Sequence, residues 1–461
     1  MFKRAVTLTI LILAAACPAG AGAAERWSVR GAGWGHGIGM SQWGAYGYAK
    51  HGAGYRDIID HYYRDTKLGS VTNGDVRVLL QANRSTIFFR HATQAGDRAL
   101  TEDTVYKATR DGNNVILRSA SGRQLEIFDG VMRVVGGKHV RVLGRADNGV
   151  RDGLYRDALE IRTAAGSGLN AINAVGLESY LLGVVPGESP ASWPAAALEA
   201  QAVAARSYAL ASNVNGKGFD QYADTRSQMY RGYLAETPST NAAVANTTGQ
   251  VVTYGGEIAT TFFFSTSGGY TENVENVFTN GSPKPWLKGV KDPYDDSSPY
   301  HRWGPYTFSR SALASKLGGW VKGRLKSFKV LERGVSPRVV KARVKGTRGS
   351  TVVTGPQIRT RLGLRDTWFF VRRVRTKRAG GEEARTLRGA RPVVALYGTV
   401  DGTKLDSVTL ERKDGDKWQS EGTFPVIDGA YRIHVATAGI YRVKAGWAPG
   451  PELRVAPPLI G

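Results

Sequence analysis

The longest regular pattern in the chain is an alternation of apolar and polar residues across residues 75–174. Residues 76–80 (VRVLL) and 114–117 (NVIL) belong to it, and glycine-bearing turns separate the runs. Successive side chains of a strand point to opposite faces of a sheet, so this pattern predicts a region that is mostly β.

Helical spacing appears on both sides of this region. Residues 42–50 and 55–63 are predicted helices, and in the second Ile58, Ile59 and Tyr62 fall on one face. Residues 194–212 are rich in alanine and predict a buried helix, with Ser192 as its N-cap and Pro194 in its first turn. Residues 258–265 predict a core strand that ends in a tight turn.

Short alternating runs recur at 393–397, 407–412, 431–435 and 440–444, and they predict a small C-terminal β-sandwich. The predicted fold class is therefore α+β, mostly β, with a β-rich inserted region and this sandwich. The predicted segments are a signal peptide (1–24), a glycine-rich motif segment (25–70), the β-rich region (71–170), a core (171–376), a polar linker (377–391) and the sandwich (392–461).

The first residues have the layout of a secretory signal peptide, because Lys3 and Arg4 precede an apolar run that ends in small residues. That run is shorter than the roughly 20 residues of a membrane span, so cleavage near Ala23 or Ala24 is expected to release a secreted protein without a transmembrane anchor. Cys17, the single cysteine, lies inside this segment and would leave no disulfide in the mature chain. The alternative is that Cys17 carries a lipid.

Positive charge is concentrated in one part of the chain. The formal net charge is +23, and residues 302–391 contain 24 Lys or Arg and 4 Asp or Glu, a balance of +20. Such a field attracts polyanions. Export and the lack of any nucleic-acid-binding motif argue against nucleic acid, which leaves anionic polymers outside the cell or a merely solvated surface as the two interpretations.

Three stretches carry the most specific sequence signal: residues 33–45 (GWGHGIGMSQWGA), 178–188 (ESYLLGVVPGE) and 201–208 (QAVAARSY). Residues 266–272 (TSGGYTE) and 292–295 (DPYD) support them. Together they resemble the SpoIID/LytB family, that of stage II sporulation protein D, over residues 27–374. In that family the Gly-His-Gly stretch follows a Leu-Gly-Leu region, whereas here it precedes residues 362–364. The domain is therefore predicted to be circularly permuted.

The resemblance implies a peptidoglycan lytic transglycosylase, which cuts the bond between N-acetylmuramic acid and N-acetylglucosamine and leaves a 1,6-anhydro product. One carboxylic acid suffices, because it can protonate the glycosidic oxygen and then accept the proton of the muramic acid 6-hydroxyl. Glu188 matches the family's catalytic Glu. Nearby Pro186, Pro190 and Trp193 predict an apolar loop that raises its pKa, whereas a position at a helix N-terminus would lower it.

Arg206 is the second candidate catalytic residue. It lies within the alanine-rich helix, where a charge needs a partner, so it either orients the catalytic carboxylate or forms a structural ion pair with Glu199. The candidate substrate-binding residues are His36, Ser41, Gln42, Gln201, Tyr230 and Ser267. For His36 and its neighbours, and likewise for Tyr230 and Ser267, the alternative is that they hold loops together.

Metal and partner predictions also follow from the resemblance. Some family members carry a zinc-associated His-Cys pair, but Arg226 and Ser227 occupy those positions here, and neither is a usual zinc ligand. No metal and no cofactor are therefore predicted. The expected location is the cell wall, and the expected partner is the glycan strand, with anionic wall polymers and a cell-wall amidase as further candidates. The competing hypothesis is a non-catalytic, wall-binding enhancer of an N-acetylmuramoyl-L-alanine amidase.

Overall fold

The structure is a computed structural model that describes residues 24–72, 74–214, 218–278, 282–378, 394–401 and 405–455. The predicted signal peptide, with Cys17, lies outside these residues except for Ala24. The predicted linker also lies outside them, apart from Lys377 and Arg378, which end a strand. Within the described ranges, the helices are too short or too polar to cross a bilayer.

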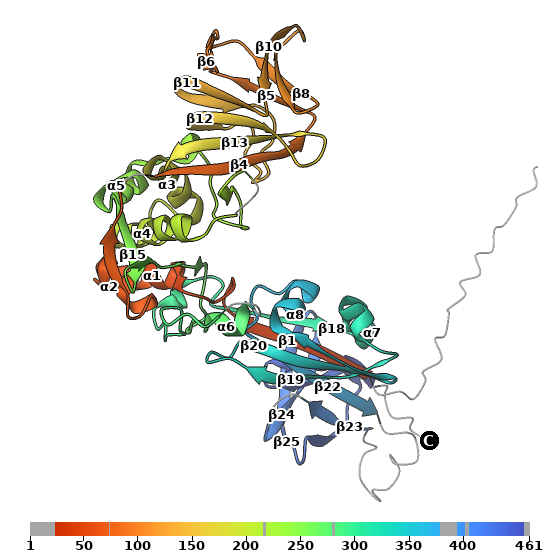
Figure 1. The fold of residues 1–461 in the computed structure, drawn as a ribbon. Helices are drawn as coiled ribbons and strands as arrows, with labels where there is room; N and C mark the ends of the chain where they lie inside the picture. Colours follow the sequence, from red (N-terminus) through yellow and green to blue (C-terminus); the bar gives the residue numbers. More distant parts are fainter. Residues whose placement is uncertain are drawn as a thin grey trace, which may run out of the picture.

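The described residues form three bodies that follow one another along an arc (Figure 1). We name them the β-rich body (residues 75–176), the helical body (built around α1 to α5) and the C-terminal body (β1 and residues 302–455). The chain starts in the C-terminal body, passes through the helical body into the β-rich body, and then returns through the same two bodies.

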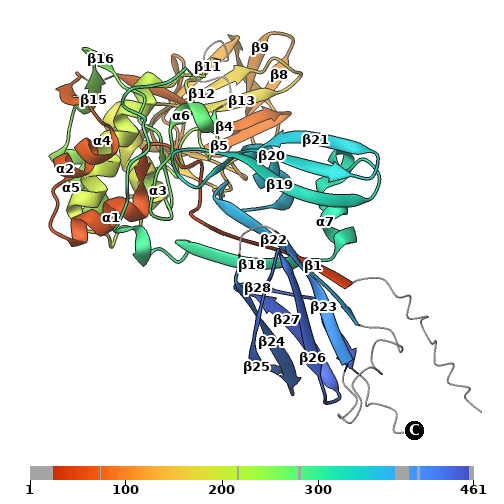
Figure 2. The same cartoon turned by 90° about the horizontal axis from the view of Figure 1, so that it is seen from below.

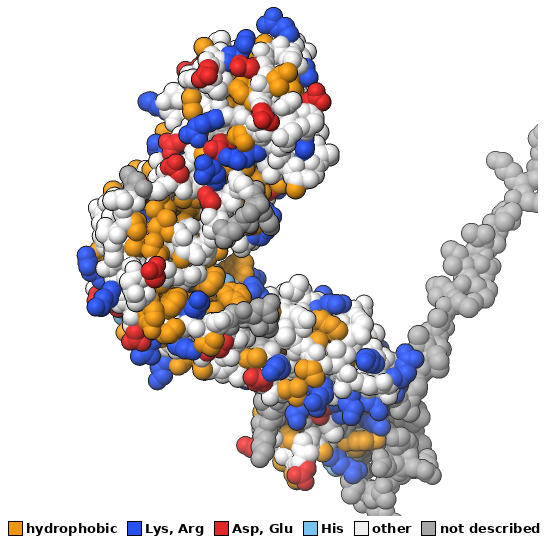
Figure 3. All heavy atoms as spheres, in the orientation of Figure 1, with side chains coloured by type: hydrophobic (Ala, Val, Ile, Leu, Met, Phe, Trp, Pro, Cys, Tyr) orange, Lys and Arg blue, Asp and Glu red, His pale blue; other side chains and the backbone are white. Residues whose placement is uncertain are grey.

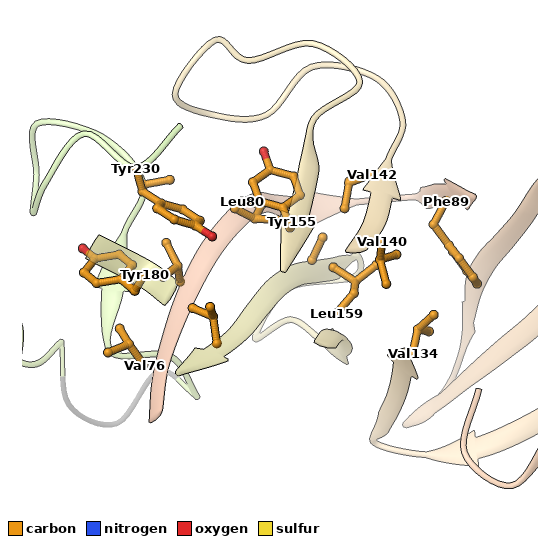
Figure 4. Packing of buried hydrophobic residues seen from close by; sticks show 14 of the residues in the cluster. Val76, Leu80, Phe89, Val134, Val140, Val142, Tyr155, Leu159, Tyr180 and Tyr230 are labelled. Atoms are coloured by element: carbon orange, nitrogen blue, oxygen red, sulfur yellow. The ribbon is translucent and has the colours of Figure 1, made fainter. Parts of the chain in front are cut away.

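The β-rich body is one large sheet in which strands pair mainly antiparallel, in the order β10-β9-β8-β5-β11-β12-β13-β4-β14. Its inward side chains, such as Val78, Leu80 and Leu159, are buried, which confirms the alternation predicted for this region (Figure 4). The strands are β4 (Asp75–Arg84), β5 (Thr86–Arg90), β6 (Gln94–Ala95), β7 (Arg98–Ala99), β8 (Tyr106–Asp111), β9 (Asn114–Ser119), β10 (Gln124–Asp129), β11 (Val131–Val142), β12 (Leu154–Thr163), β13 (Leu169–Gly176) and β14 (Gln221–Tyr222).

The helical body is arranged around α4, which contributes to two hydrophobic cores. Ala202 and Ala205 belong to a core shared with the β-rich body, whereas Val203 and Ala204 belong to a core shared with α1 and α2. Small alanine side chains let neighbours approach α4 from both sides. The helices are α1 (Gln42–Lys50), α2 (Tyr55–Tyr62), α3 (Leu177–Glu188), α4 (Ala195–Ala211), α5 (Pro238–Asn246) and α6 (Val274–Val277).

The three predicted helices are confirmed, with one correction at the start of α4. Pro194, and not Ser192, occupies the N-cap of α4, and it provides no side-chain hydrogen bond. The predicted core strand at 258–265 is wrong, because only its two ends are in strands, β16 (Glu257–Ile258) and β17 (Phe263–Phe264). β15 (Gln250–Tyr254) pairs with β16 and with β3 (Lys67–Ser70), whereas β17 pairs in parallel with β2 (Met40–Ser41). This second pairing fixes the glycine-rich motif to the helical body.

The C-terminal body contains a sheet in the order β18-β1-β22-β23-β26, so the first described strand lies between strands from far along the chain. A second sheet of β24, β25, β27, β28 and β29 packs with it around Val374, Leu396 and Leu410 (Figure 2). This confirms an α+β, mostly β fold with a C-terminal sandwich. Because β22 pairs with β23, the sandwich shares its sheet with β1, and the predicted domain boundaries stay a prediction.

Strands dominate the C-terminal body, and two short helices accompany them. Its elements are β1 (Ala24–Ala32), β18 (Arg302–Phe308), α7 (Arg310–Leu317), β19 (Leu325–Arg333), β20 (Val339–Gly346), β21 (Gly349–Thr354), α8 (Gly355–Leu362), β22 (Phe369–Arg378), β23 (Val394–Asp401), β24 (Ser407–Asp414), β25 (Lys417–Pro425), β26 (Ala430–Val435), β27 (Gly439–Ala445), β28 (Ala448–Pro449) and β29 (Leu453–Val455).

A buried ion pair within the C-terminal body also contacts the turn that follows β17. Arg338 donates two hydrogen bonds of 2.9 Å to Asp366, and both side chains are almost fully buried. The same guanidinium donates to the carbonyls of Ser267 and Tyr270. A charge taken out of water needs such partners on every side, so this contact ties the turn after β17 to the start of β20.

Candidate active site

Glu188 is the last residue of α3, which corrects the prediction that it lies in a loop. Its carboxylate accepts a hydrogen bond from the Met229 backbone N–H at 2.7 Å and one from Gln42 Nε2 at 3.1 Å. Gly187 allows this approach, because a Cβ at that position would lie 2.2 Å from the Met229 carbonyl oxygen. Two helices and one loop therefore hold the carboxyl group.

Burial raises the pKa of Glu188 above its ordinary value. The hydrogen bonds from Met229 and Gln42 and the nearby charge of Arg231 oppose this shift but do not cancel it. A carboxylate at a helix C-terminus also faces the partial negative charge of the helix, which disfavours ionisation. The carboxyl group therefore keeps its proton to higher pH than an exposed glutamate does, although the residue as a whole remains partly exposed.

Gln42 and Gln201 lie beside Glu188, as two of the predicted substrate-binding residues. Gln42 begins α1 and Gln201 faces it from α4, and Gln42 Nε2 also donates to Gln201 Oε1 at 3.3 Å. Both side chains are nearly buried. Their position shows that they fix the orientation of the Glu188 carboxyl group, and Gln42 does so directly.

Several residues near Glu188 were missed by the sequence analysis. Burial raises the pKa of Tyr208, and the charge of Glu188 raises it further, so the two groups are close enough to interact. Tyr208 is seven residues from Gln201 on α4. That spacing puts both on one helix face and is a signal that could have found it. Arg231 was missed too, although it follows two residues after Met229 in the matched Gln-x-Tyr-x-Gly stretch.

An aromatic cluster is formed by α1 and the loop that precedes α4. The ring centroid of Trp193 lies 5.2 Å from those of Trp43 and Tyr46, which are themselves 5.4 Å apart. All three rings are partly exposed. Trp43 follows Gln42 directly in α1, so one helix supplies both a ring of the cluster and a donor to Glu188. Neighbouring rings of this kind offer an apolar surface with polar edges.

Arg206 does not contact Glu188 in the structure. Its guanidinium is fully buried and donates to both carboxylate oxygens of Glu178, at 2.8 and 2.6 Å, and to the Gln250 carbonyl at 3.0 Å. These contacts therefore support the alternative that Arg206 forms a structural ion pair. Its proposed partner was wrong, because Glu199 accepts a hydrogen bond from Asn246 instead.

His36 stabilises the glycine-rich loop through hydrogen bonds at both ring nitrogens. Its Nδ1 accepts from the Ile38 backbone N–H at 3.0 Å, so Nε2 carries the proton and donates to the Phe263 carbonyl at 2.9 Å. Burial lowers the pKa of His36 to about 3, which keeps the ring neutral. At least one of the neighbouring glycines is needed for packing within the protein, because a Cβ at Gly39 would lie 2.1 Å from the backbone oxygen of Phe262.

Ser41 and Ser267 are both buried around Asp295. Ser41 Oγ donates to Asp295 Oδ1 at 2.9 Å and accepts from the Gly44 backbone N–H as the N-cap of α1. The Ser267 backbone N–H donates to the same oxygen at 2.8 Å, and His301 lies 2.9 Å from the other. Both serines are fully buried. Their contacts with Asp295 hold three loops together, whereas the prediction was that they bind sugar.

Tyr230 belongs to the hydrophobic core and not to a cleft. Its ring packs against Tyr180 and Tyr155, and its hydroxyl donates to Asn173 Oδ1 at 2.6 Å (Figure 4). Only 1% of the residue is exposed. Burial of the large apolar ring is favourable, and the single hydroxyl of Tyr230 has a hydrogen-bond partner inside the protein.

Asp292 is a second carboxyl group with an elevated pKa. Burial and the neighbouring Asp295 raise the pKa to about 7, and Tyr62 donates a hydrogen bond of 2.9 Å to Asp292 Oδ1. Asp292 is fully buried, unlike Glu188. Of these two residues, Glu188 is therefore the one that solvent partly reaches.

The positions that would carry zinc ligands have other contacts. Arg226 forms an ion pair with Asp224 at 2.8 Å, and Ser227 Oγ accepts from the Tyr222 backbone N–H. In the part of the chain that the structure describes, no group of three His, Cys, Asp or Glu side chains is close enough together to hold a metal ion.

Comparison with known protein families matches one part of the chain. Residues 165–254 match the family model described as stage II sporulation protein, SpoIID. The chain carries a domain of the SpoIID family. Glu188 and Gln201 lie inside this SpoIID domain, whereas Gln42 and the aromatic residues of α1 lie outside it and reach it through the fold.

Individual relatives match a longer part of the chain. Stage II sporulation protein D of Bacillus subtilis (strain 168) is 33% identical over 216 residues, which are 43% of this chain and 61% of the relative. The protein of the same name from Bacillus amyloliquefaciens is 32% identical over 237 residues, or 48% and 65%. The "Amidase enhancer" of Bacillus subtilis is 35% identical over 161 residues, or 31% and 22%. The chain thus spans less than two thirds of these relatives, and its circular permutation stays a prediction.

Proposed function

We propose that this protein is a cell-wall enzyme, a peptidoglycan lytic transglycosylase with Glu188 as its acid and base. The observation that carries the proposal is the state of the Glu188 carboxyl group. It is desolvated enough to have a raised pKa, yet partly exposed and held by donors from two elements. Such a carboxyl group is suited to general acid catalysis near neutral pH.

The proposed reaction has two proton transfers through this one group. Protonated Glu188 gives its proton to the glycosidic oxygen while the bond to the muramic acid C1 breaks, and the N-acetylglucosamine leaves with a new hydroxyl. The carboxylate then accepts the proton of the muramic acid 6-hydroxyl as that oxygen bonds to C1. The ring closes as the 1,6-anhydro product and Glu188 is protonated again.

The surroundings of Glu188 support both steps. Gln42 and Met229 donate to the carboxylate formed after the first transfer, and the charge of Arg231 also stabilises it. The aromatic cluster of Trp43, Tyr46 and Trp193 supplies an apolar face next to the acid, on which a sugar ring of the glycan strand would stack.

Product analysis tests this proposal directly. The mature protein, incubated with purified peptidoglycan, is expected to release muropeptides that end in 1,6-anhydro-muramic acid. Mass spectrometry separates these from reducing-end products, which differ by one water. Reducing ends would mean that water replaces the 6-hydroxyl and that the enzyme is a hydrolase.

Gln42→Leu is expected to move the alkaline limb of the kcat/KM profile to higher pH. Gln42 donates to the carboxylate form of Glu188 and thereby lowers its pKa. Without that donor the carboxyl group keeps its proton to higher pH, so the enzyme form with protonated Glu188 persists to higher pH. Gln201→Leu is the matched control, because Gln201 lies in the same network but accepts its hydrogen bond from Gln42. A limb that moves to lower pH in Gln42→Leu, or equally in both variants, contradicts this role.

A second candidate function is a wall-bound enhancer of a cell-wall amidase, which the match to the Bacillus subtilis Amidase enhancer favours. In that case the wild-type protein would release neither type of sugar product. It would also stimulate an added N-acetylmuramoyl-L-alanine amidase as well after Glu188→Gln as before it.

A further inference from the structure

The C-terminal body forms one end of the arc, whereas α3, which ends at Glu188, lies in the helical body (Figure 1). A groove of about 740 Å³ lies in this C-terminal body. It lies between β1, β19, β22 and the turn that joins β27 to β28. Its side chains include Trp27, Arg30, Lys329, Arg333, Arg372 and Trp447. Figure 3 shows Lys and Arg side chains gathered on this body, whereas the β-rich body presents both signs of charge.

Cations enter the groove from three separate strands. Arg30 comes from β1, Lys329 and Arg333 come from β19, and Arg372 comes from β22. Arg30 and Lys329 are exposed, and neither forms an ion pair with a carboxylate of the described residues. Arg333 donates to the Phe369 carbonyl at 3.1 Å. The positively charged side chains therefore line a groove and are not spread over a flat surface.

The two acidic residues that line the groove pair with cations other than Arg30 and Lys329. Glu332 pairs with Lys341 at 2.9 Å, outside the groove. Asp401 pairs with Arg373 and, at 3.3 Å, with Arg375. The groove thus keeps an excess of positive charge after its own carboxylates have found partners.

The ring of Trp447 packs against two of the guanidinium groups. The Arg30 and Arg372 guanidinium carbons lie 4.6 and 5.1 Å from the centroid of Trp447. Burial lowers the pKa of Arg372, and the charge of Arg30 lowers it further, so the two cations repel each other. A bound anion would relieve this repulsion, and preordered guanidinium groups lose less entropy on binding.

We propose that this groove binds a phosphodiester-linked anionic polymer of the cell envelope, at a site separate from the SpoIID domain. Arg30 of β1 and Lys329 of β19 come from two different sheets that line the groove, which suits the tetrahedral oxygens of phosphate better than one planar carboxylate. Lysine and arginine together are common phosphate ligands. The surrounding charge of residues 302–391 extends the attraction beyond the groove, as a repeating polyanion would require.

Binding to the isolated polymer tests this site without any dependence on catalysis by Glu188. The full mature chain is titrated into a fluorescein-labelled poly(glycerol phosphate) chain, and anisotropy reports the Kd. Arg30→Gln combined with Lys329→Gln is expected to weaken binding about tenfold or more, since charge-assisted hydrogen bonds are lost at two points. Neither side chain has an ion pair within the described residues, so folding is expected to survive, and circular dichroism checks this.

Lys316→Gln combined with Lys322→Gln is the matched control, because it removes the same charge from exposed positions of the same segment outside the groove. The control is expected to change Kd by less than about threefold, through screened long-range attraction alone. An equal loss in both double variants would overturn the proposal in favour of a diffuse basic surface. Tighter binding of polyglutamate or of a DNA duplex of matched length would overturn the assignment to a phosphodiester polymer of the envelope.

Discussion

Glu188→Gln is expected to lower the release of 1,6-anhydro-muropeptides by roughly 10²–10⁴-fold, the usual contribution of general acid–base catalysis. Glutamine has nearly the same shape and can still accept the hydrogen bond from Met229 N–H. It cannot donate a proton to the leaving oxygen or accept one from the 6-hydroxyl. Quantifying anhydro-muropeptides over time, with both proteins at equal concentration, measures the effect.

The stability of the same variant provides the control. The folded protein raises the pKa of Glu188, so it binds this proton more tightly than the unfolded chain does. The stability that the proton contributes is present below the unfolded pKa and is lost as pH rises through the folded pKa. Glu188→Gln should therefore unfold at an equal or higher temperature than wild type at neutral pH. A lower unfolding temperature together with lost activity would point to a structural role.

Arg206→Ala is expected to destabilise the fold by about 3–5 kcal/mol, because removing one member of a buried ion pair leaves the other charge without its partner. Arg206 is fully buried and binds Glu178 through two hydrogen bonds. The lost cation would also leave the Gln250 carbonyl without its donor. Chemical denaturation of the purified variants measures the change in the free energy of unfolding.

Two companion variants separate this structural role from a catalytic one. Glu178→Ala should lose a similar amount of stability, and Arg206→Met combined with Glu178→Leu should recover part of it, because a buried ion pair is often replaced by apolar side chains with little loss. In the double variant, activity per folded molecule should stay near that of wild type. Full stability with a large fall in kcat would instead show that Arg206 acts on the reaction.

How much of the candidate site was predictable differs from residue to residue. Glu188, Gln42 and Gln201 were all picked out by their motifs, and the structure places the two glutamines beside Glu188. Their predicted catalytic and substrate-binding roles stay predictions. His36 and Ser267 come from equally clear motifs, yet their polar atoms are used inside the protein. A motif shows that a residue type matters, but a buried polar group takes whichever partner the packing supplies.

Local periodicity in the sequence by itself determined α1, α2, α4 and the strands of the β-rich body, because side-chain direction repeats with a fixed period along a helix or strand. Only the tertiary structure determined which distant residues form hydrogen bonds and ion pairs with one another. Gln42 reaches Glu188 across 146 residues, and Arg206 pairs with Glu178 and not with Glu199 on its own helix. The period of a helix or strand reports which face is buried, but it carries no information on the distant segment that covers that face.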